Sequence, residues 1–240
     1  MQAALETRTL PFVDPGNEET MSREGEKAIE DWFLALHHVR VPFRPNERLL
    51  LLYGHPLVFR LGLYAATERV LDGESVLYLD GANTFDPFVI GRLARAHRQQ
   101  PRKVLSMIHV ARAFTCHQME RLVSDCLASA LDRYQSRIAI LSGLFDTFYD
   151  EAVPERETLR LFGRTMEAVI KLTQQGFTLL CLCPPAPMLT RMSRRCLDQF
   201  RGQADRVIRV REEQGLVKLE EEGCAVGQTW EVARSVLVER

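Results

Sequence analysis

The segment Gly54–Leu61 lies where an apolar run meets a helical pattern, which is the place of a phosphate-binding loop in many nucleotide-binding proteins. Such a loop reads Gly-x4-Gly-Lys-(Ser/Thr), because backbone N–H groups wrap the phosphates, lysine neutralises their oxygens and the hydroxyl holds Mg²⁺. Here Phe59 takes the place of the second glycine, Pro56 has no N–H to donate, and Leu61 replaces the hydroxyl. Only Arg60 keeps a positive charge. The segment therefore predicts a nucleotide site that has lost its ligands.

The elements that position this loop alternate between strands and helices. Short continuous apolar runs indicate strands buried on both faces, and apolar residues at helical spacing indicate helices. We expect strands over Arg48–Tyr53, Ser75–Leu79, Val104–Val110, Ile138–Leu141 and Phe177–Cys183, and helices over Leu57–Leu71, Pro87–His97, Cys116–Tyr134 and Glu157–Gln174. This alternation predicts an α/β fold with a mostly parallel central sheet flanked by helices.

The two ends of the chain have different patterns. Residues 1–24 lack periodicity and are expected to be a mobile tail before one core domain of residues 25–240. Apolar residues at helical spacing predict a helix over Gly25–His38.

Toward the C-terminus, Asp205–Arg211 and Gly215–Glu221 alternate apolar and charged residues around a turn, which predicts an antiparallel hairpin. Trp230–Val238 fits either a last strand or a short helix.

Several stretches resemble the ATP-binding core of the RecA/RadA-type DNA recombinases. Leu77–Pro87 is similar to the family's strand that runs into Asp-Thr-Glu-(Gly/Asn)-Thr-Phe-Arg-Pro, and Ile108–Met119 to its Val-Ala-Arg-Ala-Phe/Tyr-Asn-x-(Asp)-His-Gln segment. Ile138–Phe148 resembles its Walker B strand, and Val153–Arg160 is weakly similar to its first DNA-binding loop. The resemblance spans about residues 25–221 and implies a RecA-like P-loop NTPase core without the family's additional N-terminal DNA-binding domain.

The resemblance also places the remaining catalytic positions. Ser142 follows the Walker B strand where the family has the aspartate that fixes Mg²⁺, and serine cannot supply that charge. The family's catalytic glutamate falls on Ala82. With Phe59 and Leu61 in the phosphate loop, these residues imply a pseudo-ATPase that does not hydrolyse ATP and uses no cofactor.

Arginines are the candidates for DNA contact. Pro184–Arg211 carries seven arginines against two aspartates, and its first half matches the position of the family's second DNA-binding loop. Arginines on such a loop suit phosphate contacts, although a solvated helix face is an equal alternative. The candidates are Arg191, Arg194, Arg195 and Arg201, with Arg156 and Arg160 near the acidic first-loop region. A second basic run, from Arg92 to Lys103, fits better a surface helix end that favours cations.

Composition narrows the class of protein further. The 240 residues have a formal net charge of −1, so any nucleic-acid contact must depend on local patches. Six cysteines without a CxxC pair indicate free thiols in a reducing compartment, the cytoplasm or a nucleus. The apolar runs are too short to span a membrane, and His37, His38 and His55 have no ligand cluster beside them, which predicts no metal site.

These patterns lead to one main hypothesis and two alternatives. The main one is a non-catalytic recombinase paralogue that acts in DNA repair or recombination by binding DNA, a recombinase-type partner or another copy of itself. The first alternative is a structural subunit that pairs with an active RecA-like ATPase without binding DNA. The second is an enzyme of unrelated chemistry around His55, Asp80 and Ser142, although no nucleophile–base spacing supports it.

Overall fold

An eight-stranded sheet forms the centre of the computed structural model, which describes residues 33–36, 39–42, 46–148, 153–183, 191–223 and 228–238. Its strands are β3 (Leu49–Tyr53), β4 (Val76–Asp80), β5 (Ile108–Arg112), β6 (Ile138–Ser142), β7 (Thr178–Cys183), β8 (Arg206–Glu213), β9 (Leu216–Glu221) and β10 (Thr229–Ala233). They lie in the order β10-β9-β8-β3-β7-β6-β4-β5. The pairs from β8 to β5 are parallel, and the two pairs that join β8, β9 and β10 are antiparallel. The predicted α/β class, mostly parallel sheet and C-terminal hairpin are confirmed.

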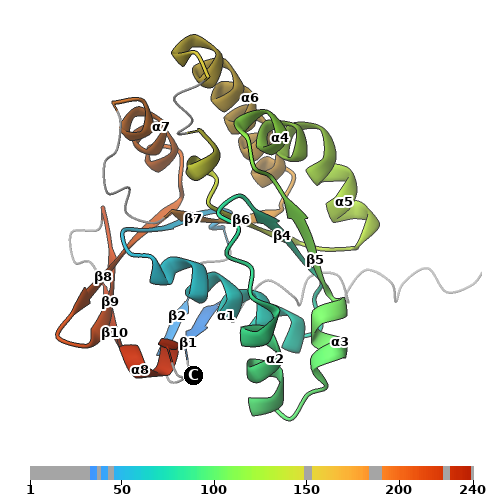
Figure 1. The fold of residues 1–240 in the computed structure, drawn as a ribbon, viewed down its shortest axis with the longest axis vertical. Helices are drawn as coiled ribbons and strands as arrows, with labels where there is room; N and C mark the ends of the chain where they lie inside the picture. Colours follow the sequence, from blue (N-terminus) through green and yellow to red (C-terminus); the bar gives the residue numbers. More distant parts are fainter. Residues whose placement is uncertain are drawn as a thin grey trace, which may run out of the picture.

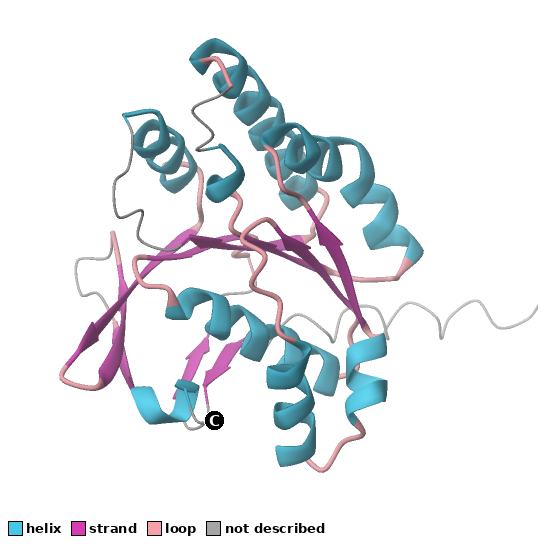
Figure 2. Ribbon diagram, viewed as in Figure 1, coloured by secondary structure: helices cyan, strands magenta, loops and turns pink. Residues whose placement is uncertain are grey.

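Helices cover both faces of this sheet (Figures 1 and 2). Below the edge-on sheet of Figure 1 lie α1 (Leu57–Leu71), α2 (Pro87–Ala96) and α3 (Pro101–Ser106). Above it lie α4 (Cys116–Arg121), α5 (Leu127–Arg133), α6 (Glu155–Gln174) and α7 (Arg191–Arg201). A π-helical turn over Leu122–Cys126 joins α4 to α5, a short 3₁₀ turn covers Phe145–Phe148, and α8 (Arg234–Val238) follows β10.

The central strand β3 shows why these residues fold in this way. Leu49 to Leu52 are all buried, and alternate side chains point to opposite faces of a strand. Leu50 and Leu52 pack in the core between the sheet and the helices α1 and α2. Leu49 and Leu51 pack in the core between the sheet and the helices α4, α6 and α7. A run without polar residues is therefore required at this position.

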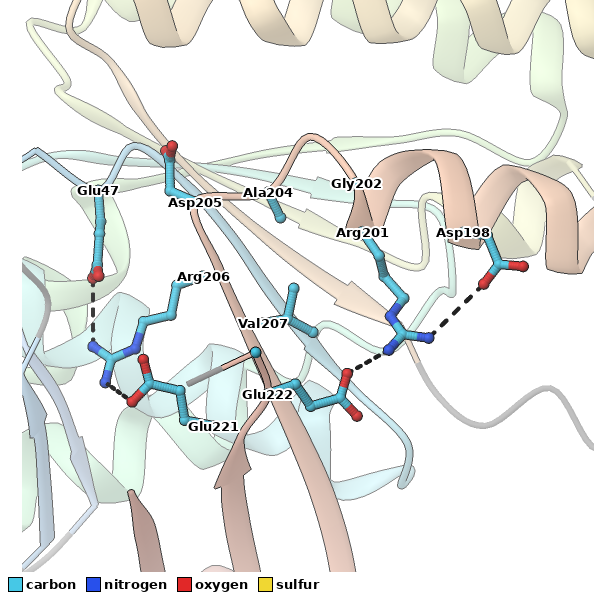
Figure 3. Close-up of a pocket in the computed structure, with 11 residues that line it drawn as sticks. Glu47, Asp198, Arg201, Gly202, Ala204, Asp205, Arg206, Val207, Glu221 and Glu222 are labelled. Carbon is cyan, nitrogen blue, oxygen red and sulfur yellow. Dashed lines mark hydrogen bonds and ion pairs between the residues drawn. The ribbon is translucent and has the colours of Figure 1, made fainter. Parts of the chain in front are cut away.

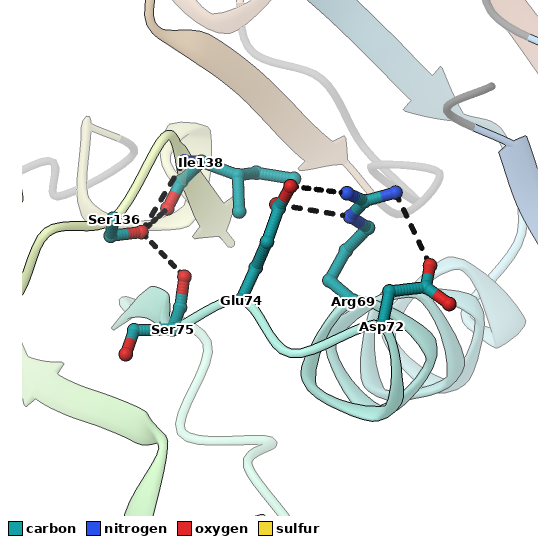
Figure 4. A network of polar contacts seen from close by, with 6 residues as sticks. All are labelled: Arg69, Asp72, Glu74, Ser75, Ser136 and Ile138. Carbon is teal, nitrogen blue, oxygen red and sulfur yellow. Dashed lines mark hydrogen bonds and ion pairs between the residues drawn. The ribbon is translucent and has the colours of Figure 1, made fainter. Parts of the chain in front are cut away.

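Polar side chains close the amino ends of β4 and β6 (Figure 4). The Ser136 hydroxyl lies 2.7 Å from the Ser75 carbonyl oxygen and accepts the N–H of Ile138. Arg69 at the end of α1 pairs with Glu74 and Asp72. These contacts tie α1 to the strand that follows it and fix β4 beside β6.

The helix predicted over Gly25–His38 is wrong where the structure describes it. Phe33–Leu36 is β1 and Val39–Pro42 is β2, and the two pair in an antiparallel hairpin in which Leu36 faces Val39. Valines at 39 and 41 favour extended backbone, and a two-residue connection suits a hairpin. Residues 25–32 of that predicted helix, and the predicted tail 1–24, lie outside the described residues.

The predicted strand Val104–Val110 begins too early. Val104 to Ser106 belong to α3, and β5 starts at Ile108. Pro101 at the first helical position sets the backbone angle for a helix, and Val104 is buried between helix and sheet. The apolar run spans both elements, so periodicity alone does not separate them. Trp230–Val238 resolves into both predicted elements, a strand to Ala233 and then a helix.

Candidate functional site

The loop between β3 and α1 is where the sequence predicts a lost phosphate loop, and the N–H groups of Gly54, Leu57 and Val58 are engaged there. Only three residues separate the two elements. The N–H of Gly54 donates to the Cys183 carbonyl oxygen at 3.1 Å, and the N–H of Leu57 donates to Nδ1 of His55 at 3.2 Å. The N–H of Val58 donates to the His55 carbonyl oxygen. A phosphate loop needs several free N–H groups that point inward, and this turn does not supply them.

The side chains of the predicted nucleotide site serve the fold. Phe59 packs against the core below the sheet, and Leu61 is fully buried there. The guanidinium of Arg60 donates to the Leu237 carbonyl oxygen at 3.1 Å, so it holds α8 on α1. The contacts of Phe59, Arg60 and Leu61 thus hold all three side chains within the fold, and none of these contacts orients a side chain toward a phosphate.

A carboxylate stands beside the same loop. Glu212 of β8 lies 3.5 Å from Nε2 of His55 and 3.3 Å from Nε of Arg234. A negative charge at this position opposes the binding of a polyphosphate.

The loops that carry Ser142 and Ala82 pack against each other. Ser142 is buried, pairs with Asp80 across β4 and β6, and faces the Thr84 hydroxyl at 3.2 Å. A Cβ built on Gly143 would lie 2.4 Å from the Cβ of Ala82, so the two loops touch.

Asp80 is the one carboxylate in this cluster, and the backbone uses both of its oxygens. They accept the N–H groups of Thr84 and Phe85 at 2.9 and 3.0 Å. Arg112 lies 3.5 Å from the same carboxylate. Burial raises the pKa of the Tyr78 hydroxyl nearby, so that group stays neutral. The residues present therefore do not fit MgATP.

The alternative of an unrelated enzyme at this edge gains no support from these contacts. His55 contacts Glu212, Asp80 is held by backbone N–H groups, and Ser142 faces a threonine hydroxyl. Each of the three side chains thus has a different partner, and no base is placed on a nucleophile. Among the described residues, no group of three or more His, Cys, Asp or Glu side chains is placed to hold a metal ion.

The candidate DNA-binding arginines divide into exposed and engaged side chains. Arg156 and Arg160 are exposed on the first turns of α6, and Arg194 and Arg195 are exposed on α7. Arg201 is engaged, because it pairs with Glu222 and Asp198. Arg191 begins α7, and its side chain lies outside the described residues.

Arg201 and Arg206 contact carboxylates in a pocket of about 490 Å³ at the amino ends of β3 and β8 (Figure 3). Arg206 lies there with its side chain 4% exposed, 3.4 Å from Glu47 and 3.1 Å from Glu221. Its guanidinium also stacks on the Trp230 ring, 5.5 Å from the centroid. No local sequence pattern indicates this pocket, because its carboxylates come from residues far apart in the chain.

A second feature that sequence reasoning missed is the edge strand β5. Among the described strands it pairs with β4 alone, and Val110 on it is 40% exposed. Beside it lies an apolar pocket of about 180 Å³, lined by Leu77, Leu79, His109, Val110, Ala111, Leu122, Cys126, Leu127, Ala130 and Tyr134. In the sequence, Ile108, Val110 and Arg112 occupy every second position and therefore share one face of the strand. This pattern leaves an apolar residue, Val110, on a strand that has one free edge.

The His109 imidazole in the wall of this pocket favours its uncharged form. The His109 ring stacks on Tyr134 with centroids 3.7 Å apart. Desolvation by burial lowers the pKa of His109, so the neutral imidazole is favoured.

A comparison with models of known protein families finds no match to this chain. None of the described helices is long and apolar enough to cross a membrane.

Proposed function

We propose that this chain is a non-catalytic protein with a RecA-like core, which acts as an accessory in DNA repair or homologous recombination by binding a recombinase-type partner. The similarity of Leu77–Pro87 and Ile108–Met119 to the RecA/RadA-type segments supports the kinship. The engaged donors of the β3–α1 loop support the loss of ATP binding. The open edge of β5 beside an apolar pocket is the observation that favours a protein partner.

Edge strand β5 has the properties of a strand-addition site. A strand at the edge of a sheet presents unpaired N–H and C=O groups, and an extended peptide can satisfy them. The sheet has a second edge at β10, but β2 contacts that strand. Of the two edges, β5 is thus the one that the described residues leave open.

The apolar pocket supplies the specificity that backbone hydrogen bonds lack. Its volume of about 180 Å³ is below the roughly 300–1,000 Å³ of small-molecule sites. Leucines, alanines and the His109–Tyr134 stack line it. A pocket of this size and polarity suits an apolar side chain of the added strand better than a cofactor.

Titration of the full chain with a purified RecA-type recombinase tests this proposal. Val110→Asp places a charge at the edge and should weaken the complex at least tenfold, since burial of a valine side chain contributes about 1.5–3 kcal/mol. Leu216→Asp is the matched control, because Leu216 is also a strand residue with 38% exposure but lies in β9. It should bind like the parent chain.

Two results would contradict the proposal. One is that no RecA-type recombinase binds at micromolar concentration. The other is that Val110→Asp and Leu216→Asp bind with the same affinity, which would place the interface elsewhere.

The alternative of an assembly subunit without DNA contact shares this interface. Under it, an arginine of this chain would complete the ATP site of a neighbouring subunit. The hydrogen bond from Arg60 to Leu237 speaks against that residue in the role. Exposed Arg194 and Arg195 on α7 remain candidates both for this role and for DNA contact.

A further inference from the structure

The helices α2 and α3 carry a surface of unpaired positive charge. Arg95, Arg98, Arg102 and Lys103, here named the α2–α3 basic surface, are all exposed. No carboxylate occurs in the sequence between Asp86 and Glu120. Within the part of the chain that the structure describes, no ion pair is formed by these four side chains.

The ion pair at the end of α2 involves a different group. His97 lies 3.6 Å from Glu68 of α1. The described residues therefore supply no carboxylate in an ion pair with the four cations of the surface. By contrast, Arg201 and Arg206 near α7 are each held by carboxylates.

Arg98 occupies a backbone conformation that favours glycine. Its φ is +56°, and it follows the last residues of α2. The N–H of Arg98 donates to Arg95 and that of Gln99 donates to Ala94, which is the hydrogen-bond pattern of a Schellman motif. Glycine is the usual residue at this position, because it alone has no Cβ to crowd the left-handed backbone. An arginine here is therefore not explained by the stability of the helix end.

Arg102 is also placed against local preference. It lies in the first turn of α3, directly after Pro101. The amino end of a helix has a partial positive charge, so a cation is unfavourable there. Favourable charge at a helix end explains Arg95 in the last turn of α2 and Lys103 in the last turn of α3, but not Arg102.

An exposed aromatic ring continues the same surface. Phe88 is 80% exposed, and it precedes Arg92 by four residues and Arg95 by seven on α2. Residues at these spacings share one face of a helix. The buried residues Val89, Ile90 and Ala94 lie on the other side.

We propose that the α2–α3 basic surface, together with Phe88, binds single-stranded nucleic acid. Proteins that bind single strands combine cations along the backbone with aromatic rings on which bases stack, and this face has both. It lies on the opposite side of the sheet from α6 and α7, whose arginines are the other candidates (Figure 1). The surface does not depend on strand addition at β5, so either interaction can exist without the other.

The test measures binding of the full chain to fluorescein-labelled oligo(dT) and to a duplex of equal length over a range of salt concentrations. Arg98→Gly removes one cation while it relaxes the backbone, so the variant should be at least as stable as the parent. We expect its plot of log affinity against log salt concentration to be less steep by about 0.7, the value for one phosphate contact with a single strand.

Gln135→Gly is the matched control for Arg98→Gly. Gln135 has φ +49° and forms the same pair of hydrogen bonds at the end of α5, but it carries no charge. It should leave the salt dependence unchanged. Phe88→Ala should weaken binding to oligo(dT) by about five- to a hundredfold, the range for loss of one stacked base.

Four outcomes would overturn the proposal. The first is that the chain binds neither nucleic acid. The second is that Arg98→Gly, like Gln135→Gly, has the same salt dependence as the parent. The third is that poly-glutamate displaces oligo(dT) at equal charge concentration, which would assign the surface to an acidic protein. Finally, Phe88→Ala leaves the affinity for oligo(dT) unchanged while the duplex binds as tightly, which would exclude single-strand selectivity.

Discussion

Replacement of Arg206 by leucine should destabilise this protein more than any other arginine substitution on β8. The Arg206 side chain is 4% exposed and lies between Glu47 and Glu221, which are also buried. Arg206→Leu removes, from a region of low dielectric, a cation that both carboxylates contact. Loss of one partner of a buried pair costs roughly 3–5 kcal/mol, most of it from the uncompensated charge that remains.

Arg211→Leu is the matched control. Arg211 lies on the same strand and pairs with Glu220 of the same neighbouring strand, but its side chain is 41% exposed. Exposed pairs contribute about 0–1 kcal/mol, because water screens the charges. The two variants thus share the same chemical change, strand and type of partner, and they differ in burial.

Urea unfolding followed by circular dichroism measures both variants. Arg206→Leu should lower the midpoint by about 1–2 M relative to the parent, and Arg211→Leu should leave it nearly unchanged. Equal midpoints for the two variants would refute the reasoning. That result would show that the burial of the Arg206 side chain adds nothing to the stability of the fold.

Three further predictions concern stability and titration. Gly54→Ala should destabilise the fold by about 1–3 kcal/mol in urea unfolding, because Gly54 has φ +112° and a Cβ would lie 2.8 Å from the Val210 carbonyl oxygen. Burial lowers the pKa of His109, so the free energy of unfolding should decrease as the pH falls below the ordinary value of 6.5, and His109→Phe should reduce that decrease. Burial first, and then the hydrogen bond to Glu222, raise the pKa of Tyr53 to about 12. The free energy of unfolding should therefore fall as the pH rises from about 10 to about 12, and Glu222→Gln should lower the Tyr53 pKa in an ultraviolet titration of tyrosinate.

The order of strands and helices could be predicted from the sequence wherever one period dominates. The four leucines of β3 and the long helical pattern of α6 are unambiguous, and both elements form as expected. One failure occurs where a single apolar run spans two elements. Val104–Val110 contains the end of α3 and the start of β5, and its division depends on how Val104 packs in three dimensions.

The candidate site was predictable in part. The residue types at Phe59 and Leu61 indicated a lost phosphate loop, and the structure adds that the remaining backbone donors are engaged. The partners of the arginines were not predictable. Arg206 meets Glu47 only because β3 and β8 are neighbours in the sheet, and a local count of charges does not contain that information.

The α2–α3 basic surface was likewise not predictable from a local count of charges. The sequence shows a basic run from Arg92 to Lys103, which a helix end can explain. Only the backbone shows that Arg98 stands in the left-handed conformation and that Arg102 opens a helix.

Calorimetric titration of the full chain with MgATP is the most direct test of the account, because the loss of ATP binding is its central claim. We predict no saturable heat up to about 1 mM, the upper end of the usual range of enzyme Michaelis constants, and no release of phosphate. The engaged N–H groups of Gly54 and Leu57 and the charge of Glu212 are the reasons for this prediction. Saturable binding of MgATP with turnover would contradict the account.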